Sequence, residues 1–176
     1  WVSCSSLTLF SVSAAAASSR MYGLCRVIAR PGYLWLLSTV LIAGCCSYAG
    51  LPIIEVEVNE RPLLLEVAAD RPSRSCGLAY RRSLPEGHGM LFVVPEPEPL
   101  EFWMRDTRIP LAIAFLDQQG RILSIEQALM SGRDARYRSP GPAAFAIEVA
   151  AGWFEKNDVS VGDLLQINLP PELEVR

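Results

Sequence analysis

Leu111-Ala112-Ile113-Ala114-Phe115-Leu116 is a stretch without a single polar side chain. Because no position in it can face water, it predicts a central strand that is covered on both faces. Asp117-Gln118-Gln119-Gly120 follows as a hairpin turn that ends in glycine, and Arg121–Ala128 predicts the next strand. We therefore expect Ile113 and Phe115 to be core residues.

Further strands are expected on both sides of this hairpin. Alternating Ile and Val with Glu at 54–58, a turn at 59–62 and a second strand at 63–68 predict a hairpin. Asp70 is a candidate N-cap for a helix over Arg71–Tyr80. The remaining expected elements are strands at Met90–Val94, Leu100–Met104, Phe145–Val149 and Leu164–Leu169, and a short helix at Gly152–Asn157 closed by Asp158.

Two segments are expected to lie outside regular structure. Pro95–Pro99 contains three prolines and predicts an extended, polyproline-like link, and Gly132–Ala143 predicts a surface loop. The pattern gives seven or eight strands, two short helices and no repeated βαβ unit. It indicates a mainly β (α+β) domain: a compact, mostly antiparallel sheet that closes toward a barrel.

Charge is distributed unevenly along the chain. All 19 acidic residues follow residue 50, but only 13 of the 16 basic residues do, so that part carries a formal charge of −6. Nucleic-acid binding needs clustered Lys and Arg to neutralise phosphates. We therefore expect no nucleic-acid partner.

The N-terminal part has the pattern of an export signal. Arg26 and Arg30 precede the uncharged run YLWLLSTVLIA at 33–43, and Ile42-Ala43-Gly44-Cys45 follows. This ending resembles the lipobox of bacterial lipoproteins, which implies that Cys45 carries a lipid and anchors the mature protein in a membrane. An uncleaved anchor or a simple cleaved signal is the alternative, although a spanning helix needs ~20 apolar residues.

These patterns give a domain plan. Residues 1–20 contain no Met, and we expect translation to start at Met21 and these residues to come from a start assigned too far upstream. Residues 21–44 are the expected signal peptide, 45–52 a tether, 53–170 the β-rich domain and 171–176 a tail. The expected location is the bacterial cell envelope. Cys46 next to the lipid site is not Asp, which in enteric bacteria favours the periplasmic face of the outer membrane.

Cysteine and histidine offer few chemical groups. Within the expected domain only Cys76 occurs; it is either a buried free thiol or the partner of Cys46 in a disulfide. His88 is the single histidine, without spaced partners for a metal, and no Gly-rich phosphate loop is present. We expect no metal, no cofactor and no Ser-His-Asp triad.

The densest candidate site is the stretch 101–110, EFWMRDTRIP. On a strand, Trp103 and Arg105 share one face, and Asp106 and Thr107 follow at the turn. Trp with Arg is a common recognition pair, although Trp103 could instead cover the core while Asp106 and Thr107 bond turn backbone. His88 and Met90 lie on a Gly-flanked segment that could approach the same rim.

Several ordered motifs make the chain resemble domain-of-unknown-function family 192. They are 77–81 GLAYR, 89–92 GMLF, 102–111 FWMRDTRIPL, Glu148 with 151–153 AGW, and 161–163 VGD. The resemblance spans about 54–167. It implies a small β-rich domain that is often exported, and it implies no activity.

This chain departs from the family pattern at three of these positions. The family usually has Met at Ala79, Asn at Asp106 and Asp at Ala112. Ala112 removes a carboxylate next to the 103–110 stretch, which Asp106 could replace in charge but not in position.

Two functions stay open from the sequence. One is a binding or envelope-assembly module that uses Trp103, Arg105 and Asp106 on a small molecule, glycan or peptide. The other is an enzyme of unknown class, such as a hydrolase, built around Asp106, Arg105, Arg81 and His88. A deep pocket joining those four side chains would favour the enzyme, and a shallow aromatic groove would favour binding.

Overall fold

The computed structural model describes residues 50–129 and 135–176, so the expected signal peptide, Cys45 and Cys46 lie outside the described residues. The described part contains six strands and two short helices. They are β1 (Ile53–Val58), β2 (Arg61–Ala68), α1 (Arg71–Cys76), β3 (His88–Trp103), β4 (Leu111–Leu116), β5 (Ile122–Ala128), β6 (Arg136–Ala150) and α2 (Trp153–Lys156).

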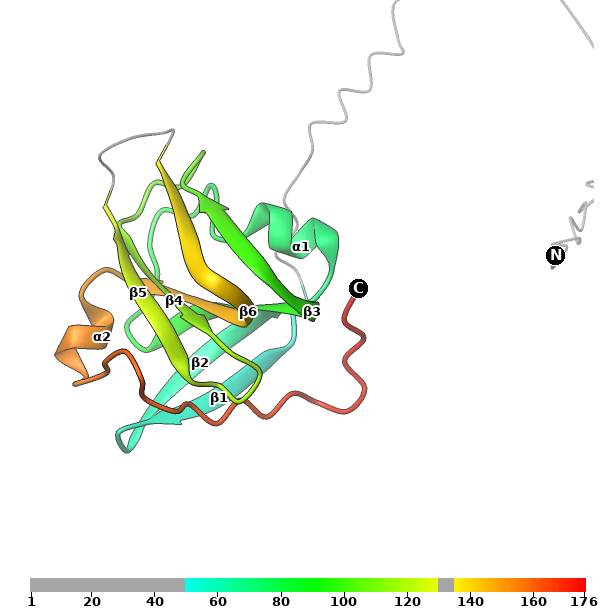
Figure 1. Ribbon diagram of the computed structural model, residues 1–176. Coiled ribbons are helices and arrows are strands. Elements are labelled where there is room, and N and C mark those ends of the chain that lie inside the picture. Colours follow the sequence, from blue (N-terminus) through cyan, green and yellow to red (C-terminus); the bar gives the residue numbers. More distant parts are fainter. Residues whose placement is uncertain (1–49, 130–134) are drawn as a thin grey trace, which may run out of the picture. The chain divides into compact units, whose positions relative to one another are not determined.

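The six strands form one sheet in the order β1-β2-β3-β6-β4-β5 (Figure 1). All neighbours are antiparallel except β2 and β3, whose connection contains α1 and crosses over between parallel strands. The prediction of a mainly β domain with a mostly antiparallel sheet is confirmed. The sheet stays open, since no pairing joins β1 to β5 among the described residues.

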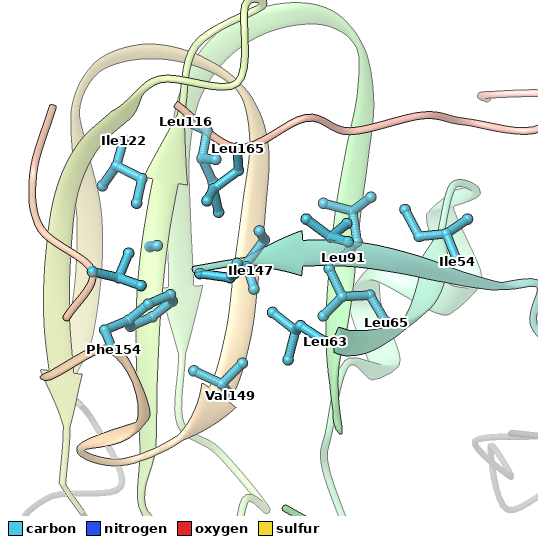
Figure 2. Packing of buried hydrophobic residues seen from close by; sticks show 14 of the residues in the cluster. Ile54, Leu63, Leu65, Leu91, Leu116, Ile122, Ile147, Val149, Phe154 and Leu165 are labelled. Carbon is cyan, nitrogen blue, oxygen red and sulfur yellow. The ribbon is translucent and has the colours of Figure 1, made fainter. Parts of the chain in front are cut away.

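The apolar stretch 111–116 is β4, and every residue in it is buried. Its side chains alternate between two hydrophobic clusters on opposite faces of the sheet. Ala112, Ala114 and Leu116 belong to the first cluster. Figure 2 shows part of this cluster, in which side chains of the sheet such as Ile54, Leu116 and Ile147 gather with Phe154 of α2. Ile113 and Phe115 belong to the second. The predicted central strand, covered on both faces, is confirmed.

β3 and β6 are much longer than the sequence pattern predicts. β3 runs through the expected link at Pro95–Pro99, and β6 includes most of the expected loop, with pairs from Arg136 onward. The register shifts between Val93 and Glu98, where a bulge accommodates prolines that cannot donate to the ladder. The outer halves of the two strands therefore form a paired arm beyond the bulge.

The predicted strand at Leu164–Leu169 is wrong. A single bridge joins Leu164 to Arg121, because Gly120 brings the backbones together: a Cβ there would lie 2.2 Å from the carbonyl oxygen of Leu165. Beyond this contact the tail runs extended and packs its apolar side chains, Ile167, Leu169, Leu173 and Val175, against the first cluster.

The helix α1 begins as predicted and ends earlier. Asp70 accepts a hydrogen bond from the backbone N–H of Ser73, and the side chain of Ser73 contacts Asp70 in return, which completes a capping box. The helix ends at Cys76 instead of Tyr80, because Gly77 adopts a φ of 51°. The segment from Gly77 to Tyr80 is thereby free to turn across the sheet.

We predict that truncating Phe115 strongly destabilises the domain. Its side chain is fully buried and packs edge-on against Phe102 with ring centroids 5.6 Å apart. Phe115→Ala should lower the free energy of unfolding by ~3–5 kcal/mol in urea melts. Gln118→Ala in the exposed turn is the control and should change it by less than ~0.5 kcal/mol. A similar small loss for Phe115→Ala would contradict this core assignment.

Candidate functional site

A pocket of about 440 Å³ lies where β3 bends away from the core. Three segments line it: 74–80 from the end of α1, the part of β3 from Phe92 to Trp103, and the turn at 105–107. A fourth contribution is a single residue of β6, Glu148. The bulge in β3 and the early end of α1 therefore create this space together.

Glu148 is the buried polar group of the pocket. It pairs in register with Met90 of β3 and Ile113 of β4, and both of these residues are fully buried. Glu148 itself is 5% exposed, and its Oε2 atom has no hydrogen-bond partner among the described residues. Burial raises its pKa to about 8, so the carboxyl group is mostly neutral near pH 7.

Gly77 keeps the space next to this carboxyl group open. A Cβ at position 77 would lie 3.4 Å from Cζ of Phe92 and 3.8 Å from Oε2 of Glu148. The ring of Phe92 in turn packs edge-on against Phe102, with centroids 4.7 Å apart. The glycine that ends α1 thus leaves no side chain of its own between the carboxyl group of Glu148 and the ring of Phe92.

The rim of the pocket is held by a contact between two strained residues. Tyr80 and Asp106 both have positive φ, 63° and 60°, a backbone conformation that costs a non-glycine residue about 1–3 kcal/mol. The N–H of Tyr80 donates to the carbonyl oxygen of Asp106 (2.9 Å), and its hydroxyl donates to Oδ2 of Asp106 (3.0 Å). That hydroxyl bond raises the pKa of Tyr80 above its ordinary value.

Trp103 and Arg105 form the outer part of the rim. The guanidinium of Arg105 lies 5.0 Å from the centroid of the Trp103 ring, and that of Arg136 lies 4.7 Å from it. The side chain of Arg105 is 65% exposed, and its ion pair with Asp106 is long, at 3.9 Å. Arg105 therefore keeps most of its donors in solvent, where a ligand could reach them.

The structure brings together some of the residues singled out from the sequence. Trp103, Arg105, Asp106 and Thr107 all line the pocket. Arg81, His88 and Met90 do not line it.

Each of those three side chains is placed elsewhere. Both terminal nitrogens of Arg81 contact the carboxylate of Glu66, at 2.6 Å each. Nδ1 of His88 lies 3.0 Å from the carbonyl oxygen of Glu86 in the preceding loop, and Met90 is fully buried in β3. The four residues of the enzyme hypothesis, Asp106, Arg105, Arg81 and His88, thus do not share one pocket.

The structure also explains two further positions, 148 and 112. Glu148 is not among the candidate site residues singled out from the sequence, although it is the lone acidic residue within the apolar run 143–151. Ala112 is fully buried in the first cluster, on the sheet face opposite Glu148. A carboxylate at position 112 would therefore not belong to this pocket.

We predict that Glu148 makes stability depend on pH. The folded pKa of about 8 exceeds the ordinary value of 4.5, so the folded protein binds more protons than the unfolded chain between these values. This contribution is fully present below about pH 4.5 and is lost as the pH rises through about 8. In that window, the free energy of unfolding of wild type minus that of Glu148→Gln should fall by up to ~1.4 kcal/mol per pH unit.

Urea melts of both proteins across this pH range measure the effect. Two curves that run parallel from about pH 5 to about pH 8 would show that Glu148 does not titrate as its burial requires.

Comparisons with known proteins fit this architecture. Residues 54–167 match the model of the DUF192 family, described as an uncharacterized ACR. No curated protein matches the chain. Among solved structures, a candidate transcription regulator from Sinorhizobium meliloti has 30% identity and a TM-score of 0.62, and the match covers 68% of this chain and 97% of that one.

A second solved structure is a protein of unknown function from Novosphingobium aromaticivorans. It has 26% identity and a TM-score of 0.61, and the match covers 68% of this chain and 89% of that one. Since the family model spans most of the described residues, from β1 to the start of the tail, the chain belongs to the DUF192 family.

Proposed function

We propose that this domain is a binding module, and that it takes a small ligand into the pocket between α1 and β3. The observation that carries the proposal is the unpartnered Oε2 of Glu148, buried within that pocket. A buried polar group without a partner costs about 1–3 kcal/mol, and a ligand that bonds to it recovers that cost. The exposed donors of Arg105 offer a second point of attachment at the rim.

Binding is favoured over catalysis by what surrounds the pocket. Asp106 already accepts the hydroxyl of Tyr80, and the lining contains no Ser or Cys next to a histidine base. The one observation in favour of an enzyme is the raised pKa of Glu148, which suits a proton donor near neutral pH. A proton donor alone does not define a reaction, so we keep binding as the proposed function.

For the whole protein we propose a lipoprotein of the cell envelope, attached to a membrane through Cys45. The signal-like pattern at 26–45 motivates this proposal. The state of Cys76 supports it, because Cys76 is disulfide-bonded and disulfides persist in oxidising compartments. Its partner lies outside the described residues, so the Cys46–Cys76 pair stays a prediction. Among the described residues, no helix has both the length and the apolar composition to cross a membrane.

The description of the Sinorhizobium protein does not extend to this chain in our proposal. A transcription regulator that binds DNA needs a cluster of cations, and the part of this chain after residue 50 carries a formal charge of −6. Several of its arginines are also held by carboxylates, as Arg81 is by Glu66 and Arg136 and Arg138 are by Glu101.

We predict that Arg105 is needed for binding and not for folding. A thermal-shift screen of amino acids, short peptides, sugars and carboxylates against the purified mature protein should yield compounds that raise its melting temperature. Arg105→Ala should weaken their binding at least about tenfold, which is ~1.4 kcal/mol, and leave the melting temperature without ligand nearly unchanged.

Arg108→Ala is the matched control, since Arg108 is an exposed arginine on the same turn that does not line the pocket. A large drop in melting temperature for Arg105→Ala alone would assign Arg105 a structural role and remove the rim from the proposal.

We predict that Cys45→Ser releases the protein from the membrane. Without the thiol no lipid can be attached, and the anchoring energy of about 0.8 kcal/mol per buried methylene group is lost. Cell fractionation and intact-mass measurement of the chain check this. A variant that stays as membrane-bound as wild type and matures to the same mass would contradict the anchor; Cys46→Ser serves as the control that keeps the lipid site.

A further inference from the structure

The charged groups around the pocket can be divided into those with internal partners and those without. Arg74 has partners: its guanidinium donates to the backbone carbonyls of Ala69, Val93 and Arg176. Its cation is therefore used to fasten α1 to the strand and the tail. It is not directed at the carboxyl group of Glu148.

Two acidic residues of the lining also have internal partners. Glu101 is bound by Arg136 and Arg138 on the neighbouring strand, with both contacts at 2.5 Å. Asp106 accepts from Tyr80 and lies in a long ion pair with Arg105. Neither of these two carboxylates is available to a ligand without the loss of an internal bond.

Three groups are left over once these pairs are assigned. They are the carboxyl groups of Glu148 and Glu98 and the outward-facing donors of Arg105. Glu98 is exposed, and its side chain forms no hydrogen bond or ion pair with other described residues, although its backbone pairs with Ala143. The pocket thus has two carboxyl groups and one guanidinium that a ligand could satisfy, which favours a ligand with a cationic group.

Within residues 50–129 and 135–176, no group that faces Glu148 from a neighbouring element supplies that cation. β3 and β4 present Met90 and Ile113 beside it in the sheet. The last residue of α1 is Cys76, which is disulfide-bonded and does not titrate, and the segment after α1 contributes Gly77 and the neutral phenol of Tyr80 to the pocket.

From the rim and the arm, the charged groups in the lining are Arg74, Arg105, Asp106, Glu98 and Glu101, and none of them forms an ion pair with Glu148. Burial is accordingly the cause of its raised pKa.

The surroundings of Glu148 suit an ammonium group. The absent side chain of Gly77 leaves space between Oε2 of Glu148 and the ring of Phe92, and Phe102 packs edge-on against that ring. A carboxylate together with aromatic faces is a combination that binds protonated amines, by a charge-assisted hydrogen bond and by cation–π attraction. For a neutral ligand, Gln or Asn at position 148 could form the same hydrogen bonds as Glu. Only a carboxyl group can ionise and pair with a cationic ligand, so Glu at this position favours a cation.

We infer that the ligand is a small zwitterion, such as an amino acid or short peptide, whose ammonium group binds Glu148 while its carboxylate binds Arg105. This inference rests on the proposed binding function and names its ligand class. On binding, the Glu148 O–H bond breaks, its proton leaves to solvent and the ammonium N–H donates to the carboxylate. No other covalent bond changes.

The inference predicts a direction of pH dependence. The ionised form of Glu148 binds the ammonium group, so the apparent affinity should rise about tenfold per pH unit below about pH 8 and then level off. Near pH 7, calorimetry in two buffers of different ionisation enthalpy should show release of close to one proton per ligand bound. A ligand that accepts a hydrogen bond from neutral Glu148 would show the opposite slope.

The experiment uses the purified mature protein and a series of linear probes. Glycine, γ-aminobutyrate and ε-aminocaproate vary the distance between the two charges; hexylammonium lacks the carboxylate and caproate lacks the amine. We expect one zwitterion to bind best, Glu148→Gln to abolish both its binding and its proton release, and Arg105→Ala to reduce its affinity to that of hexylammonium. Glu57→Gln, on the exposed face of β1, is the control.

The outcomes separate this inference from the proposed function. If no amine binds near pH 8, or if its affinity falls as the pH rises, the zwitterion is overturned. If the amines fail in this way but caproate or another compound from the screen binds, and Arg105→Ala weakens the binding of that compound, the pocket remains a binding site for another ligand class. Binding of amines that Glu148→Gln leaves unchanged would also overturn the inference.

Discussion

The carboxyl group of Glu148 is the constraint around which this domain is organised. Two polar side chains are buried in the described part of the chain, Glu148 and Asn157. Asn157 is satisfied, because its amide donates to the carbonyl oxygen of Trp153 at 2.7 Å and its oxygen accepts from Arg61. Glu148 lies in the middle of the sheet with an oxygen that has no such bond. A stable fold normally avoids this cost, so of these two buried residues Glu148 is the exception.

The surrounding architecture makes that exception sterically possible. A side chain at position 77 would enter the space in front of the carboxyl group, since a Cβ there would lie 3.8 Å from Oε2 of Glu148. Gly77 ends the helix and leaves this space open, and the register of β3 shifts after Val93. The arm formed by the outer halves of β3 and β6 then carries Trp103 to the rim. Backbone features that carry no chemistry themselves thus determine which functional groups meet.

Local sequence patterns predicted the buried strands and the helix cap, and they failed to predict the outer half of β3. The wholly apolar β4, the β1–β2 hairpin and the cap at Asp70 each follow from patterns within a few residues, and all three are confirmed. The length of β3 could not be predicted in this way. Three prolines argue against a strand locally, and the pairing of the outer arm with β6 that holds it is a contact between distant segments.

The sequence alone predicted the residues at the rim of the candidate site and did not predict Glu148, which is buried inside it. Trp103, Arg105, Asp106 and Thr107 are consecutive or nearly so, so a short motif suffices to group them. Glu148 lies 41 residues after Thr107, and only the pairing of β6 with β3 and β4 brings it to the same pocket. A lone acidic residue in an apolar run shows in sequence that a carboxyl group is buried. It does not show whether a partner accompanies it.

The residue at position 106 sets the charge next to Arg105 at the rim. Position 106, where the family pattern that this chain resembles usually has Asn, needs a residue that tolerates a positive φ and accepts a hydrogen bond from Tyr80. Asn and Asp both meet these requirements. Asp adds a negative charge 3.9 Å from Arg105, which Asn does not. With Asp at position 106 the guanidinium of Arg105 is therefore partly neutralised, whereas Asn at this position would keep the same backbone and leave that guanidinium without the neighbouring negative charge.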